Sequence, residues 1–155
     1  MPGSLPTLLI GVGNDYRSDD GVGRVIVRRI AAMNLPGVQI AETSGEGTAL
    51  MALWSTQARI FLFDAAQSGA KPGTIHRIDT SRSPVPTGFF HYSTHAFSVA
   101  EAIELSRALA TLPENLILYG VEGSRFEHGD QLSPAVALAA GQVVERVVRE
   151  LQETQ

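Results

Sequence analysis

Leu9-Ile10-Gly11-Val12-Gly13-Asn14, followed closely by Asp19-Asp20-Gly21-Val22-Gly23, is the most informative segment of this chain. It predicts a buried strand that ends in a glycine turn and leads, through two adjacent carboxylates, into an amphipathic helix. Open α/β sheets bind their ligands outside the carboxyl ends of the strands. The pattern therefore predicts a functional site at the end of the first strand.

The glycine turn does not fit a dinucleotide-binding motif. G-x-G-x-x-G requires a third glycine at position 16, where this chain has Tyr16. Asp19 and Asp20 also add negative charge where that motif uses the positive end of a helix to bind pyrophosphate. We interpret the turn as part of a cation site. Two plainer interpretations stay open, in which Asp19 caps the helix and Asp20 is a partner of the helix dipole.

Composition limits the possible classes of function. With 155 residues, 44% hydrophobic and 18% charged, the chain is expected to form a single globular domain over residues 1–155. A net charge of −4, with basic residues scattered along the chain, argues against a nucleic-acid partner. No apolar run approaches the roughly 20 residues of a membrane span, and we expect no signal peptide. The absence of cysteine excludes disulfides, thiol catalysis and zinc–thiolate sites, and agrees with a cytoplasmic location.

Alternating strand and helix patterns predict the architecture. Continuous apolar runs are typical of strands covered on both faces, and the weakest run alternates as an edge strand does. We therefore expect a three-layer α/β/α sandwich around a mostly parallel, twisted sheet of about five strands. The predicted strands are Thr7–Gly13, Gly37–Glu42, Ala58–Asp64, Thr74–Asp79 (the edge strand) and Asn115–Val121, and the predicted helices are Asp20–Met33, Ser98–Leu112 and 134–152, the last with Ser133 as its cap.

Three side chains are predicted to meet at the carboxyl edge of this sheet: Asp20, Asp64 and His95. Asp64 ends an apolar run, and His95 follows a long serine- and proline-rich stretch, residues 80–94. Carboxylate and imidazole ligands together suit nickel, zinc, manganese or iron. Taken singly, Asp64 can also be a turn former and His95 a capping or packed histidine. His91 lies four residues before His95, but the preceding prolines argue against one helix that contains both.

The signatures of several common hydrolases and of nucleotide-binding proteins are missing. The chain contains no H-E-x-x-H and no P-loop, and Ser44 lacks the first glycine of G-x-S-x-G. Among the remaining histidines, we expect His76 on the solvent-facing side of its strand and His128 in an exposed loop.

These motifs resemble those of the hydrogenase maturation endopeptidases, which trim the large subunit of [NiFe] hydrogenases. The resemblance covers nearly the whole chain. In some relatives a glutamate stands where this chain has Asp20, and the turn that often reads Asp-Gly-Gly-Thr is replaced here by residues 42–47. The segments that resemble the family are Gly11-x-Gly13-Asn14, Asp19-Asp20-Gly21-x-Gly23, Gly45-Glu46-Gly47, Phe63-Asp64-Ala65, Gly120-Val121 and Leu132-Ser133-Pro134.

The resemblance implies an α/β/α endopeptidase that removes the C-terminal extension of a hydrogenase large-subunit precursor after nickel insertion. It assigns the nickel-sensing acid to Asp20, the second acid to Asp64 and the histidine to His95, as catalytic and metal-binding residues. Nickel is then carried by the substrate, and other divalent metals can substitute for it. From the charge balance and the lack of a long apolar run we expect no nucleic-acid or membrane partner, and we expect a monomer.

Several alternatives stay open on the sequence alone. The metal can polarise the scissile carbonyl or activate water, which we favour, or Asp20 or Asp64 can act as a general base. A non-enzymatic metal-binding or chaperone module of the same fold would keep the same ligands. A peptidyl-tRNA hydrolase-like esterase shares the Gly-x-Gly-Asn strand end, but it should have a basic face for tRNA.

Overall fold

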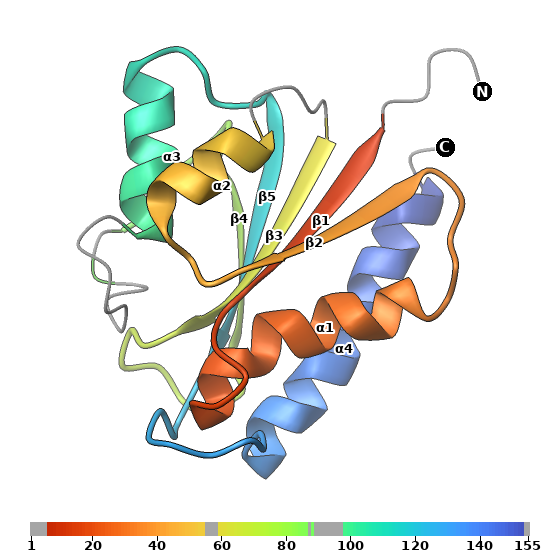
Figure 1. Ribbon diagram of the computed structural model, residues 1–155, viewed down its shortest axis with the longest axis vertical. Coiled ribbons are helices and arrows are strands. Elements are labelled where there is room, and N and C mark those ends of the chain that lie inside the picture. The colour runs from red at the N-terminus through yellow and green to blue at the C-terminus, as the bar shows by residue number, and fades with distance from the viewer. Residues whose placement is uncertain (1–5, 55–58, 87, 89–97, 154–155) are drawn as a thin grey trace.

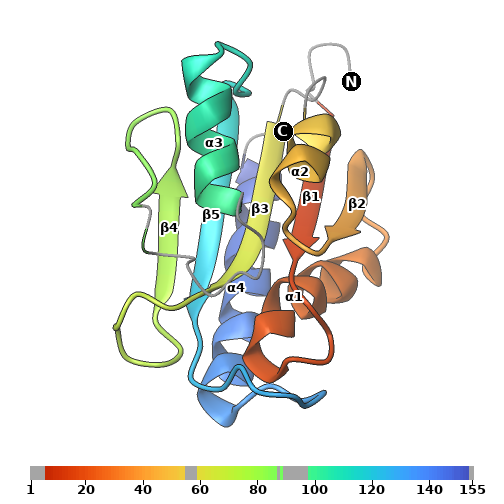
Figure 2. The ribbon, with the colours of Figure 1, turned by 60° about the vertical axis from the view of Figure 1, so that its left-hand side comes forward.

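The computed structural model describes residues 6–54, 59–86, 88 and 98–153. Five strands form one sheet in the order β2-β1-β3-β5-β4. Four of them are parallel, and β4 joins the edge of the sheet antiparallel to β5 (Figure 2). The strands are β1 (Thr7–Val12), β2 (Val38–Thr43), β3 (Arg59–Ala66), β4 (Ile75–Asp79) and β5 (Asn115–Glu122).

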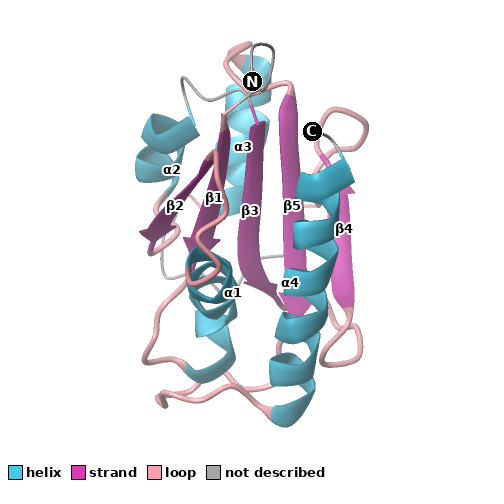
Figure 3. Ribbon diagram, turned by 90° about the vertical axis from the view of Figure 1, so that its right-hand side faces the viewer, coloured by secondary structure: helices cyan, strands magenta, loops and turns pink. Residues whose placement is uncertain are grey.

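Helices cover both faces of the sheet, which confirms the predicted three-layer α/β architecture. α1 and α4 lie side by side on one face, and α2 and α3 lie on the other (Figures 1 and 3). The sequence did not predict α2. The helices are a 3₁₀ turn (Ser18–Gly21), α1 (Val22–Ala31), α2 (Gly47–Trp54), α3 (Val99–Ala108) and α4 (Pro134–Glu153).

The central strands supply one core to each face. Successive side chains of a strand point to opposite faces, so each buried strand contributes to both cores. In β3, Phe61 and Phe63 pack with α1 and α4, while Ile60 and Leu62 pack with α2 and α3. Each of these four side chains is fully buried. This two-sided burial explains why β3 reads as a continuous apolar run rather than an alternating one.

The glycines of the opening motif bring α1 unusually close to the sheet. A Cβ atom built on Gly23 would lie 2.3 Å from the Phe63 carbonyl oxygen and 2.6 Å from that of Val12. Gly13 has a φ of 145°, and a Cβ there would lie 1.9 Å from the carbonyl oxygen of Asp20. The motif therefore holds the start of α1, and the acid just before it, directly against the ends of β1 and β3.

We expect Gly23→Ala to destabilise the protein by about 1–3 kcal/mol or more, because backbone oxygens cannot rotate away from the added methyl group. Gly141→Ala is the matched control in α4, where the new Cβ would meet only the Arg29 guanidinium at 3.7 Å. That substitution should be neutral or stabilising by about 0.4–1 kcal/mol. Urea unfolding of both variants measures the difference. Equal stability of the two variants would contradict the close-packing explanation.

None of the helices in the described ranges combines the length and the hydropathy of a membrane span.

Candidate active site

The two acids named by the sequence occupy the carboxyl edge of the sheet. Asp64 lies near the end of β3, and Asp20 lies in the 3₁₀ turn that follows β1. β1 and β3 are parallel neighbours, so their ends meet at the same edge. The predicted helix start at Asp20 is two residues early, because α1 begins at Val22 and the acids belong to the preceding 3₁₀ turn.

Asp20 is half-buried and held by its own loop. Its Oδ2 accepts a hydrogen bond of 3.0 Å from the backbone N–H of Asn14. Burial raises the pKa of the Asp20 carboxyl above its ordinary value, against the lowering effects of the Asn14 hydrogen bond and of the Arg17 and Arg24 charges. The side chain is therefore fixed in orientation while remaining partly open to a ligand.

Asp64 is a buried carboxyl group, only 8% exposed. Its Oδ1 accepts a 2.8 Å hydrogen bond from the backbone N–H of Ala65. Burial, and then repulsion from Asp20, raise the pKa of Asp64 well above its ordinary value. Among the described residues, no basic side chain forms an ion pair with either acid. A cation placed beside both carboxyl groups would remove this repulsion.

The predicted histidine ligand cannot be placed in the same way. His95 and the competing His91 both lie outside the described residues. Within the part of the chain that the structure describes, no three His, Cys, Asp or Glu side chains form a cluster able to hold a metal ion. The structure therefore places two of the three predicted site residues at one edge, and the assignment of His95 stays a prediction.

Asp19 does not cap a helix, which was the role that the sequence left open for it. Its side chain caps neither the 3₁₀ turn nor α1, because the residues at those two cap positions are Arg17 and Gly21. It is fully buried instead, and its carboxylate accepts hydrogen bonds from residues 124, 125 and 133 in the loop that connects β5 to α4. Ser133 precedes α4 as predicted, but its hydroxyl group donates to Asp19.

A third buried acid, Glu122, was missed by the sequence analysis. Its carboxylate accepts bonds from the Ser68 backbone N–H at 2.8 Å and from the Ser68 hydroxyl at 2.6 Å, and it lies 3.1 Å from His76 Nε2. The expectation of a solvent-facing His76 is therefore wrong, because Glu122 draws that ring inward. The signal was available: Glu122 ends the apolar run of β5 much as Asp64 ends that of β3. His128 is exposed, as expected.

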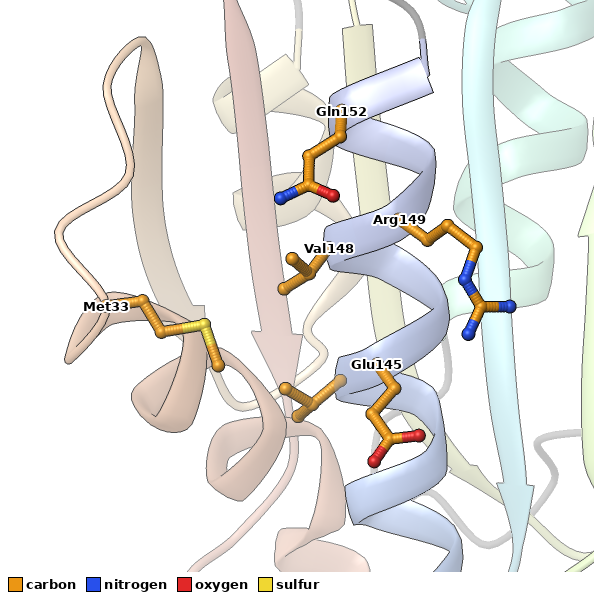
Figure 4. A pocket seen from close by; sticks show the side chains of 6 residues that line it. Met33, Glu145, Val148, Arg149 and Gln152 are labelled. Atoms are coloured by element: carbon orange, nitrogen blue, oxygen red, sulfur yellow. The ribbon is translucent and has the colours of Figure 1, made fainter.

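None of these acids lines the pocket drawn in Figure 4. It has a volume of about 320 Å³ and lies between the end of α1 and the C-terminal half of α4, whereas the candidate site lies beside the N-terminal end of α4. We therefore assign the candidate site on its chemistry rather than on its depth. The pocket is lined by Met33, Val144, Glu145, Val148, Arg149 and Gln152.

Comparison with known proteins decides the family. The family model of the hydrogenase maturation proteases (HycI) matches residues 25–150. The chain belongs to this family. The residues that match the hydrogenase maturation protease model include Asp64 and His95 and begin after Asp20.

Curated relatives agree with the family assignment along nearly the whole chain. The hydrogenase expression/formation protein HupD of Rhodobacter capsulatus is 28% identical over 157 residues, which cover 98% of this chain and 75% of HupD. The hydrogenase expression/formation protein HupM of Azotobacter chroococcum is 29% identical over 163 residues, covering 96% of this chain and 77% of HupM.

Solved structures agree as well. An endopeptidase from Escherichia coli, determined in solution, has a TM-score of 0.81 at 26% identity and covers 97% of this chain and 94% of its own. The E. coli hydrogenase maturating endopeptidase HybD has a TM-score of 0.77 at 23% identity over 97% of this chain and 94% of its own, which shows a shared fold. As a hydrogenase maturation protease, the protein is a peptidase, which favours an enzyme over the chaperone and esterase alternatives.

Proposed function

We propose that this peptidase removes the C-terminal extension of a [NiFe] hydrogenase large-subunit precursor after nickel has been inserted, and that the nickel is its recognition element. The observation that supports the proposal is the buried acid Asp64, close enough to Asp20 for the two charges to repel each other, in a chain of the hydrogenase maturation protease family. The proposal includes a single domain over residues 1–155, a monomeric state and a cytoplasmic location.

The chemistry of the two acids fits a cation brought by the substrate. Their charges repel each other, and burial penalises the ionised form of Asp64. A divalent ion removes both penalties, so a precursor that holds nickel binds more tightly than an empty one. With Asp20, Asp64 and His95 as ligands, the enzyme supplies an incomplete shell of oxygen and nitrogen donors that the precursor completes.

Two routes to hydrolysis are compatible with these residues. In the route that we favour, the nickel of the bound precursor polarises the scissile carbonyl or activates a water molecule. In the other, Asp20 or Asp64 removes a proton from the attacking water. Burial and the Asp20 charge raise the pKa of Asp64, so a cation beside the two carboxyl groups would favour its ionised form.

The role of His95 is tested by intact-mass analysis of a nickel-loaded precursor incubated with the enzyme. We expect the wild-type enzyme to release a C-terminal peptide and His95→Ala to lose the activity by about 100-fold or more. His128→Ala, the same substitution at an exposed histidine, is the control and should cleave normally. Normal cleavage by His95→Ala would remove that residue from the site.

A further inference from the structure

Asp19 is the most heavily hydrogen-bonded acid beside the candidate site, although it lies next to Asp20 in sequence. Its Oδ2 accepts bonds from the backbone N–H groups of Ser124 at 2.9 Å and Arg125 at 3.0 Å. Its Oδ1 accepts a bond of 2.7 Å from the backbone N–H of Ser133, whose hydroxyl also donates to the carboxylate. Four donor groups thus converge on one fully buried side chain.

Backbone hydrogen bonds also join the 3₁₀ turn that contains Asp19 to the loop between β5 and α4. The N–H of Asp19 donates to the Arg125 carbonyl at 2.9 Å, and that of Ser18 donates to the Gly129 carbonyl at 2.8 Å. Ser18 has a φ of 54°, a left-handed conformation that is held in place by these bonds. The Ser18 hydroxyl also donates to the Glu127 carbonyl. The 3₁₀ turn is therefore built against the loop of residues 123–133.

The same loop is anchored to the strand that contains Asp64. The N–H of Gly123 donates to the carbonyl of Ala66, two residues beyond Asp64, at 2.9 Å. The next residue, Ser124, then donates to Asp19. A short chain of hydrogen bonds thus connects the end of β3 to the turn that holds Asp20.

These contacts make Asp19 unsuited to bind substrate itself. Its two oxygens are occupied by protein donors, and none of its surface is exposed. Asp20, in contrast, is half-buried and accepts only one backbone bond among the hydrogen bonds of the described residues, from Asn14. The two neighbouring acids therefore have separate tasks.

We propose that Asp19 is a positioning residue of the peptidase: by fastening the 3₁₀ turn to the loop of residues 123–133, it fixes the Asp20 carboxylate relative to Asp64. This inference rests on the proposed function for its effect on catalysis. Its structural part concerns the bond between the Asn14 N–H and Asp20, which reports the position of the Asp20 carboxylate directly.

The test uses Asp19→Asn, which keeps the size of the side chain but replaces one acceptor oxygen with a donor. We expect kcat for the nickel-loaded precursor to fall at least about tenfold, because Asp20 is still present but its geometry relative to Asp64 is lost. We also expect hydrogen exchange at the Asn14 amide to become at least about tenfold faster.

Val147→Ala is the control for a general loss of stability, since Val147 is a fully buried residue of the α1/α4 core. Measured well below its unfolding temperature, this variant should retain wild-type kcat and Asn14 exchange. The proposal is overturned if either quantity in Asp19→Asn stays within twofold of wild type, or if Val147→Ala loses as much.

Two further measurements keep the proposal testable if Asp19→Asn does not fold or if the wild-type enzyme cleaves no precursor. If Asp19→Asn does not fold, Ser133→Ala replaces it; this variant removes only the side-chain donor to Asp19, and we expect about threefold effects on the same two quantities. If wild-type enzyme cleaves no precursor, the proposed function fails, and the Asn14 exchange rate alone decides whether Asp19 positions Asp20.

Discussion

Replacing Asp64 with asparagine is expected to abolish cleavage while making the protein harder to unfold. In the proposed function Asp64 holds the metal-bearing end of the precursor or acts as the base. Its loss should lower the rate of cleavage by about 100-fold or more. The asparagine side chain would keep an oxygen that accepts the bond from Ala65, so the local backbone is preserved.

The gain in stability follows from the direction of the Asp64 pKa. Burial and the Asp20 charge raise this pKa in the folded protein, so ionisation of Asp64 favours the unfolded state. The penalty begins as pH rises through the ordinary aspartate pKa of about 3.9 and grows until the folded-state pKa is reached. Asparagine removes it, which we expect to add about 0.5–2 kcal/mol at neutral pH, a size common for stabilising substitutions.

The measurement is thermal unfolding of metal-free protein at pH 7.5 and again near pH 4. The Asp64→Asn variant should unfold a few degrees above wild type at pH 7.5, at roughly 2–4 °C per kcal/mol, and the difference should shrink near pH 4. Asp130→Asn, at an exposed acid of the loop before α4, is the matched control and should change neither stability nor cleavage. Normal cleavage by Asp64→Asn would exclude both the ligand role and the base role.

Replacing Glu122 with alanine is expected to give the opposite result, a large loss of stability. Glu122 is 2% exposed and accepts both donors of Ser68 as well as contacting His76. Its removal deletes these partly buried hydrogen bonds to a charged group, which we expect to cost about 1–3 kcal/mol before any cavity is counted. We expect urea unfolding to show a loss of at least this size.

The charge of Glu122 is tested separately with Glu122→Gln, which keeps an acceptor oxygen. Burial raises the pKa of Glu122, but the bonds from Ser68 and His76 lower it more, so the net pKa lies below its ordinary value. The stabilisation is therefore present above the unfolded-state pKa of about 4.3 and is lost as pH falls through the folded-state value. Wild-type stability should fall below about pH 4.3 more steeply than that of Glu122→Gln. Parallel acid limbs for the two proteins would contradict this role of the charge.

The sheet and three of its helices could be predicted because their signals are local. β3 is buried on both faces and reads as one apolar run, and α4 repeats apolar residues at helical spacing. α2 was missed because it has only eight residues and most of them are apolar. It therefore shows no helical repeat of polar and apolar positions. Its position depends on packing against α3, which the local sequence does not contain.

In the candidate site, too, the residues with a local sequence signal could be predicted and those that depend on distant partners could not. Asp20 and Asp64 could be predicted because each follows or ends a strand, and parallel strands bring such residues to one edge. The hydrogen bonds of the Asp19 carboxylate could not be predicted, because its partners lie more than 100 residues away in the sequence. They include backbone N–H groups, which nearly every residue type supplies. His76 was misplaced for a related reason, because its partner Glu122 is on the neighbouring strand.

The most direct test of the central claim is a competition between two forms of one precursor. Nickel-loaded precursor labelled with ¹⁵N and unlabelled nickel-free precursor are mixed in equal amounts with the enzyme, and their intact masses are followed together. We predict that only the labelled form loses its C-terminal peptide. Shortening of both forms at the same rate would contradict recognition through the metal.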